Sequence, residues 1–178
     1  MKTFLQRGAM VACLLSAPAR AHGQAPSPLD QACGPMGAKF AVHEAPPRPS
    51  LSVPPNGGAR VVVFAETIGT GSGCGFAGFA PNVGLDGAWV GAACAGSYIS
   101  ADVRPGRHRL CVSAGRSKPA ATIALYGFTA EPGAVYYFRA EMIRPSTPST
   151  VAMHLEPLNA DEGWLLLAYR KSSVSRPK

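Results

Sequence analysis

The chain has 178 residues and a formal net charge of +7, a length that suggests one domain with or without a tail. Three of its basic residues lie in the first 21 positions, and without them 14 basic residues stand against 10 acidic ones, a net charge of +4. Such a balance, without a long basic run or interleaved aromatic residues, argues against nucleic-acid binding. No apolar run in the sequence is long enough to cross a bilayer.

The first 21 residues have the features of a secretory signal peptide. Lys2 and Arg7 form a basic start, residues 8–17 are a short apolar run, and the sequence ARA at 19–21 fits a small-x-small cleavage site. A cysteine within the apolar run weakly resembles a lipoprotein signal, but processing there would leave almost no apolar segment. We therefore expect the mature protein to be exported.

A proline-rich segment follows the predicted signal peptide. Residues 22–58 contain eight prolines and end in NGG at 56–58. Proline cannot donate the hydrogen bonds of a sheet and favours extended, solvated backbone, so this segment predicts a tether. Residues 39–42 are an exception, because their composition suits a short strand at a sheet edge.

Short apolar stretches separated by turn signals then continue to about residue 170. Residues 60–65 are a β-branched run suited to burial on both faces of a sheet. Further predicted strands cover residues 83–85, 88–91, 97–103, 107–113, 121–130, 134–143, 150–155 and 164–169, the last of them closing the domain. Between the predicted strands at 150–155 and 164–169, Asn159 begins a polar turn or a single capped helical turn.

The sequence Asp86-Gly87 predicts a two-residue type I′ hairpin, because both central residues of that turn need a positive φ. A two-residue loop pairs Trp89 with Gly84, and Val83 with Val90. We therefore expect the indole to pack in the room that the glycine leaves. The sequences PG at 105–106 and EPG at 131–133 predict further turns, the second of them a hairpin.

Strand alternation after residue 106 separates two kinds of side chain. His108 falls on the apolar face near a strand end, and we interpret it as a hydrogen-bonded structural histidine. Cys111 falls on the outer face with Arg107 and Arg109. Together with Arg104, these arginines flank a turn and are interpreted as a solvated strand end.

Four cysteines remain after the predicted signal peptide, namely Cys33, Cys74, Cys94 and Cys111. An even number in an exported protein favours two disulfides. A zinc site is the alternative, but spacings of 41, 20 and 17 residues include no C-x-x-C pair. Because Cys111 faces outward, where the tether can reach it, we favour the pair Cys33–Cys111, which leaves Cys74–Cys94 to hold the glycine-rich loop.

Several motifs in the sequence resemble sites of chemistry. Residues 73–78 read GCGFAG, which matches a dinucleotide-binding pattern, but no helical period follows and we interpret the segment as a loop. Glu141 and His154 are predicted cross-strand neighbours, which would suit a hydrolase but occur more often on ordinary surfaces. Ser72 lacks the G-x-S-x-G context of a serine hydrolase, and a thiol redox protein would need C-x-x-C. The sequence thus predicts no catalytic residue, metal site or cofactor.

The order of several pieces resembles a known family. These pieces are a valine-rich first strand, VGLDG at 83–87, GSY at 96–98, VRPGRHRL at 103–110 and EPGAVYYFR at 131–139. Together they are similar to an uncharacterised bacterial exported family, domain of unknown function 2846, over residues 60–167. The resemblance implies a bacterial envelope β-sandwich, either secreted or lipid-anchored, and thus a location in the periplasm or the extracellular space. It supplies no catalytic residues.

The sequence predicts an all-β protein with an antiparallel, immunoglobulin-like β-sandwich of about seven to nine strands. The expected divisions are a signal peptide (1–21), a tether (22–58), the sandwich (59–170) and a disordered basic tail (171–178). We expect a non-catalytic exported module that binds an envelope protein or cell-surface component. The alternative is a hydrolase of envelope polysaccharides or peptides. The loops at 69–78 and 91–96 are the expected binding surface, because loops on a rigid scaffold carry function.

Overall fold

The structure is a computed structural model that describes residues 33–35, 37–47, 51, 54–67, 73–74, 80–114, 123–143 and 152–178. Over these residues the chain forms mainly strands, with one α-helix. The elements are β1 (Phe40–Ala45), the 3-10 turn η1 (Pro55–Gly57), β2 (Ala59–Thr67), β3 (Asn82–Leu85), β4 (Ala88–Ala92), β5 (Ser97–Val103), β6 (Gly106–Ser113), β7 (Ile123–Ala130), β8 (Val135–Ile143), β9 (Ala152–Leu158), α2 (Ala160–Tyr169) and β10 (Lys171–Pro177).

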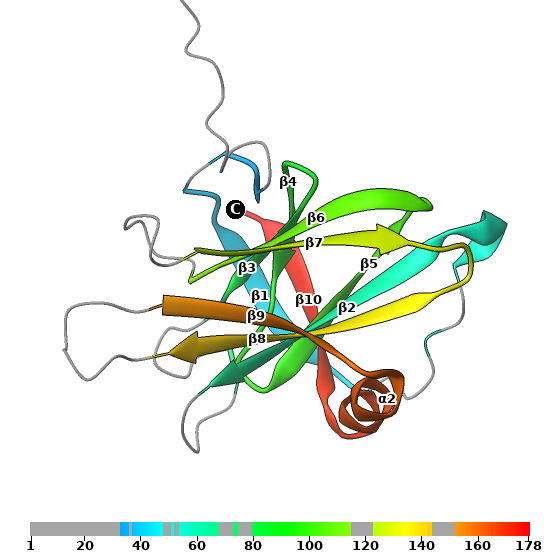
Figure 1. Cartoon of the computed structure of the whole chain (residues 1–178). Helices are drawn as coiled ribbons and strands as arrows, with labels where there is room; N and C mark the ends of the chain where they lie inside the picture. Colours follow the sequence, from blue (N-terminus) through cyan, green and yellow to red (C-terminus); the bar gives the residue numbers. More distant parts are fainter. Residues whose placement is uncertain are drawn as a thin grey trace, which may run out of the picture.

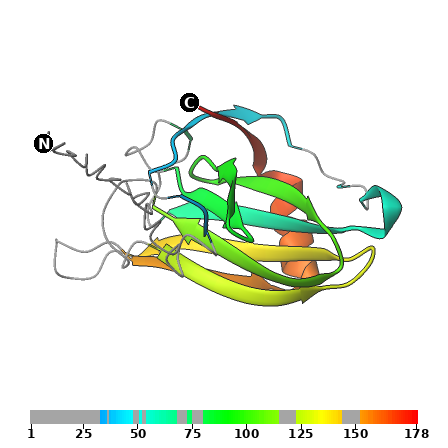
Figure 2. The same ribbon diagram turned by 90° about the horizontal axis from the view of Figure 1, so that it is seen from above.

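The strands form two sheets that face each other (Figures 1 and 2). The larger sheet has the order β1-β10-β5-β2-β8-β9 and the smaller one the order β4-β3-β6-β7. Most neighbours are antiparallel, but β2 runs parallel to β8 and β10 parallel to β5. The all-β, two-sheet class predicted from the sequence is therefore confirmed, and its immunoglobulin-like arrangement stays a prediction. The expectation of purely antiparallel sheets with about seven to nine strands is wrong, because two pairs are parallel and the described residues form ten strands.

The main core lies between the two sheets. From β2 it receives Val61 and Val63, each 2% exposed, and from the smaller sheet Leu110, which is 1% exposed. Phe138 of β8 crosses the layer, with its ring centroid 5.4 Å from those of both Tyr126 and Phe128. Burying each of these large side chains contributes roughly 1.5–3 kcal/mol before the entropy of ordering the chain is subtracted.

A second core explains why β2 is apolar on both faces. Val62 and Phe64 alternate with the inward residues of β2 and are fully buried on the opposite side of the larger sheet, beside Tyr98 and Leu167. Leu167 belongs to α2, which lies on that outer face (Figure 1). The order of layers is thus smaller sheet, main core, larger sheet and helix.

The expectation that residues 164–169 form the last strand is wrong, because they belong to α2. A short apolar run fits either a buried strand or a buried helix. Here Asn159 begins a helix, its side chain accepting a hydrogen bond from the backbone N–H of Glu162. Acidic residues in the first turn add to this cap by facing the positive end of the helix dipole.

The expectation of a disordered tail at 171–178 is also wrong, because residues 171–177 form β10 between β1 and β5. β1 pairs with β10 along its full length, from Phe40 opposite Pro177 to Ala45 opposite Ser172. The sandwich therefore extends beyond the expected range 59–170 at both ends and takes in part of the expected tether. The expected edge strand near residues 39–42 is confirmed in β1, which lies at the edge of its sheet.

The positive φ predicted for both central residues of the turn is confirmed, with 52° at Asp86 and 83° at Gly87. Gly84 faces Trp89 as predicted, but a register shift follows and Val83 pairs with Gly91 instead of Val90.

The sequence EPG at 131–133 does not form the expected hairpin, because β7 and β8 belong to different sheets. The turn between β5 and β6 also passes from one sheet to the other. Hydrogen bonds and register bring residues 58, 106, 130 and 133 to the same end of the sandwich.

Candidate functional site

His108 and Asp86 meet at the end of the sandwich where these turns gather. Nδ1 of His108 lies 2.6 Å from Oδ2 of Asp86, and Nε2 lies 2.6 Å from the carbonyl oxygen of Arg104. The other carboxylate oxygen of Asp86 accepts the backbone N–H of Arg109 at 2.8 Å. A carbonyl and a carboxylate both accept hydrogen bonds, so both ring nitrogens of His108 act as donors. This geometry favours the imidazolium form.

The surroundings change the pKa of His108 in opposite directions. Burial lowers its pKa, whereas the hydrogen bonds to Asp86 and to the Arg104 carbonyl, together with the negative charge of Asp86, raise it. The net result is a pKa above the ordinary value of 6.5. The side chain is 11% exposed and its ring centroid lies 5.5 Å from that of Phe128. His108 is therefore the hydrogen-bonded structural residue that the sequence predicted.

An open hollow of about 510 Å³ lies over β6 and β7 beside this pair. Register places Arg107 opposite Thr129 and Arg109 opposite Gly127, and all four residues are exposed and line the hollow. A Cβ atom built on Gly127 would meet only the carbonyl oxygen of His108, at 4.0 Å. The glycine thus leaves open space next to Arg109 without being required by packing.

A second hollow, of about 520 Å³, also borders Asp86 and His108. Its lining includes Asn56, Asp102 and Arg104. Asp102 is held in a two-point ion pair by Arg60, with Nε to Oδ1 at 2.6 Å and a second bond at 3.0 Å. The charge of that carboxylate is therefore already compensated from within the chain.

Some basic residues have an ion-pair partner in the described residues and others, among them Arg176 on β10 of the larger sheet, do not. On the larger sheet and beside it, Arg60, Arg139, Arg170 and Lys171 each form an ion pair with a carboxylate. In the described part of the chain, Arg104, Arg107 and Arg109 are exposed and have no ion pair, in agreement with the solvated strand end predicted for them. The end of the sandwich around His108 therefore carries uncompensated positive charge.

The structure joins Cys33 to Cys111 and Cys74 to Cys94, the two pairs favoured by the strand alternation. Cys111 lies on the outer face of the smaller sheet, and Cys33 crosses β3 at Gly84, where an added Cβ would lie 2.5 Å from the Cys33 carbonyl oxygen. The room beside Gly84 is thus filled by the disulfide segment and not by the indole. Trp89 packs against this disulfide and donates from Nε1 to the Pro35 carbonyl at 2.7 Å.

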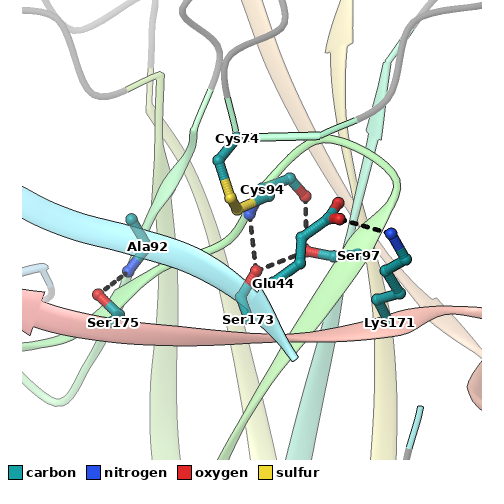
Figure 3. The surroundings of a disulfide bond; sticks show 8 residues. All are labelled: Glu44, Cys74, Ala92, Cys94, Ser97, Lys171, Ser173 and Ser175. Carbon is teal, nitrogen blue, oxygen red and sulfur yellow. Dashed lines mark hydrogen bonds and ion pairs between the residues drawn. A yellow bond between two sulfur atoms is a disulfide. The ribbon is translucent and has the colours of Figure 1, made fainter. Parts of the chain in front are cut away.

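The loop at 91–96, expected to be a binding surface, is largely buried. Ala92 to Ala95 are each at most 1% exposed. Figure 3 shows the reason: β10 passes over the loop, where the Ser173 hydroxyl accepts the backbone N–H of Cys94 at 2.8 Å and the Ser175 hydroxyl accepts that of Ala92 at 3.0 Å. The loop is therefore part of the packing. Of the companion loop at 69–78, only residues 73 and 74 lie within the described residues, so Ser72 and the rest of the GCGFAG sequence fall outside them.

The pair Glu141 and His154 faces across β8 and β9 as the register predicts. Oε1 of Glu141 lies 3.9 Å from Nε of Arg139, the centre of an ion-pair group that also includes Glu156 and Glu162. The three carboxylates form ion pairs with the guanidinium of Arg139, between the larger sheet and α2. The arrangement holds the helix to the sheet and gives no base in contact with a nucleophile.

The described residues contain no cluster of three or more His, Cys, Asp or Glu side chains able to hold a metal ion. Within the same residues, no helix has the length and hydropathy of a membrane span. No known family, curated protein or solved structure matches the chain. The resemblance to domain of unknown function 2846 therefore stays a prediction.

Proposed function

We propose that this chain is an exported, non-catalytic binding module that attaches to a component of the bacterial cell envelope. The observation that carries the proposal is the open hollow beside His108, whose exposed Arg107 and Arg109 have no ion pair within the described residues. Exposed cations on a rigid sheet are available to an external partner at little entropic cost. The sequence of the first 21 residues and the two disulfides support export to an oxidising compartment.

The finer assignments belong to the same proposal. Support for an immunoglobulin-like arrangement comes from the two packed sheets of short strands. The parallel pairs β2–β8 and β10–β5 depart from it. Support for membership of domain of unknown function 2846 comes from the ordered sequence pieces alone.

Binding to isolated envelope material tests this function. The mature chain, residues 22–178, is incubated with separated membrane, peptidoglycan and soluble-polymer fractions, and bound protein is measured over a concentration series. We expect saturable binding to at least one fraction. Because each charged hydrogen bond is worth about 1.5–3 kcal/mol, the variant R107Q/R109Q should weaken binding more than about tenfold.

The matched control is Arg176→Gln, which removes an exposed arginine from β10 on the larger sheet. It should bind as the parent does. Absence of binding to every fraction would contradict the module, and equal losses in R176Q and R107Q/R109Q would contradict the choice of face.

A hydrolase of envelope polysaccharides or peptides is the second candidate, because Glu141 and His154 are cross-strand neighbours. A screen of envelope substrates tests it. Turnover that disappears in both Glu141→Gln and His154→Ala would establish an enzyme. Absence of turnover in the parent, or turnover unchanged in both variants, would remove this pair from consideration.

A further inference from the structure

We propose that the hollow over β6 and β7 binds an acidic polysaccharide, through two oxyanion groups about 7 Å apart. This inference rests on the proposed function and names the ligand class for the same face. The bound groups are carboxylates or phosphates, which share the planar or tetrahedral oxygens that a guanidinium binds through two parallel hydrogen bonds.

The spacing follows from strand geometry. Arg107 and Arg109 are two residues apart on β6 and both point to the outer face, on either side of the inward His108. A strand rises about 3.3–3.4 Å per residue, so these two arginines leave the sheet about 7 Å apart. A single small anion can be bound by one guanidinium, whereas a chain with repeated charges can be bound by both at once.

The charge of the hollow favours an anion. Among its lining residues the one carboxylate belongs to Asp86. Oδ2 of Asp86 bonds to His108, and Oδ1 accepts the backbone N–H of Arg109. Both oxygens of Asp86 thus have partners within the chain, and neither Arg107 nor Arg109 has an ion pair in the described residues.

The residues opposite the two arginines suit a ligand that carries hydroxyls as well as charges. Gly127 opposite Arg109 has no side chain, and Thr129 opposite Arg107 adds a hydroxyl that can donate or accept. Sugars present hydroxyls between their charged groups, so a polysaccharide matches this alternation of cation and hydroxyl better than a compact ion does.

Other polyanions fit less well. Single-stranded nucleic acid needs exposed aromatic rings on which bases stack, but Phe128, the aromatic residue of this hollow, packs inward with its centroid 5.3 Å from that of Tyr136 and 5.4 Å from that of Phe138. A membrane surface needs apolar side chains beside the cations. Leu125, half exposed on β7, is the one exposed large apolar side chain of the smaller sheet among the described residues, whereas Trp164, Leu165 and Tyr169 lie on α2, on the far side of the larger sheet.

Calorimetric titration of residues 22–178 with four probes tests the proposal. The probes are polygalacturonate as a carboxylate polysaccharide, phosphorylated dextran as a phosphate polysaccharide, inorganic phosphate as a single group, and phosphatidylglycerol vesicles as a lipid surface. We expect at least one chain probe to bind more than about tenfold tighter than inorganic phosphate, with affinity that falls as salt is added. The two chain probes tell carboxylate from phosphate.

The variants separate the site from general charge. Arg107→Gln and Arg109→Gln should each weaken binding of the chain probe about tenfold or more, and Arg109→Lys should lose less because it keeps the charge without the fork. Arg176→Gln should bind as the parent does. Unchanged unfolding midpoints in all four variants ensure that the comparison concerns binding.

Several outcomes would overturn the proposal: no chain probe binds, inorganic phosphate binds as tightly as the chains, vesicles bind while the chains do not, or R176Q weakens binding as much as R109Q. The experiments distinguish a wrong ligand class from a wrong proposed function. If envelope fractions still bind and lose binding in R107Q/R109Q, the face is correct and its ligand is not an acidic polysaccharide.

Discussion

Nδ1 of His108 lies 2.6 Å from Oδ2 of Asp86, across 22 residues of sequence. The contact links the tip of the β3–β4 hairpin to the start of β6, and the second ring nitrogen binds the Arg104 carbonyl. One side chain thus ties two turns together at the end of the sandwich that carries the basic hollow.

The first prediction concerns stability against pH. The folded-state pKa of His108 is raised above 6.5 because, although burial lowers it, the bonds to Asp86 and Arg104 outweigh burial. The stabilisation that protonated His108 gives the folded state is complete below its pKa in the unfolded chain, about 6.5. It is lost as the pH rises through the pKa of His108 in the folded chain. Chemical unfolding at a series of pH values should therefore show lower stability in mildly alkaline than in mildly acidic buffer. His108→Gln should flatten this part of the profile.

The exposed His154→Gln on β9 is the control and should keep the parent profile. Asp86→Asn keeps a hydrogen-bond acceptor and tolerates the positive φ of the turn, so the hairpin should remain. Because the variant removes the negative charge of Asp86, the pKa of His108 should fall in an NMR titration. A His108 pKa at or below its ordinary value in the parent would contradict the arrangement.

The second prediction compares the disulfides. Cys33–Cys111 closes 78 residues and Cys74–Cys94 closes 20. In the chain-entropy account, the longer loop gives about 1 kcal/mol more stabilisation of the folded state. The double variant C33A/C111A should therefore unfold at lower denaturant than C74A/C94A. Non-reducing peptide mapping of the parent comes first, and a link from Cys74 to Cys111 or the reverse order of stabilities would refute the prediction.

The third prediction concerns the C-terminal strand. Ser173→Ala removes the acceptor of the buried Cys94 N–H and the partner of the Ser97 hydroxyl, 2.6 Å away. A buried group left without a partner costs about 1–3 kcal/mol. Urea unfolding should show a loss of this size, whereas Ser100→Ala, an exposed serine on β5, should leave stability within about 0.5 kcal/mol. Equal midpoints for the two variants would mean that β10 does not cover the loop.

The sequence predicts those parts of the fold that depend on near neighbours. The positive φ values at Asp86 and Gly87 follow from the turn type, and the alternation along β6 places Leu110 in the core and Cys111 outside. Burial of β2 on both faces was also predicted, because its residues are apolar at consecutive positions. These features need only a turn rule and a period of two.

What the sequence missed depends on distant partners. β10 has the polar sequence KSSVSRP, and its strand forms because β1 pairs with it and its serine hydroxyls bind the loop before β5. The pair of Asp86 and His108 depends on the register of β3 with β6, in which Leu85 faces Leu110. Nothing within either segment specifies that register.

The last prediction concerns the contact between α2 and the larger sheet. A Cβ atom at Gly163 would lie 2.1 Å from Cγ of Tyr137, so the helix approaches the sheet closely at that turn. In an exposed helix, Gly→Ala stabilises by about 0.5–1 kcal/mol. Here Gly163→Ala should instead destabilise by about 1–3 kcal/mol, because the methyl group overpacks the contact. Urea unfolding measures the difference, with Leu165→Ala, which is half exposed, as the control expected to change little. A Gly163→Ala variant more stable than the parent would show that α2 does not rest on Tyr137.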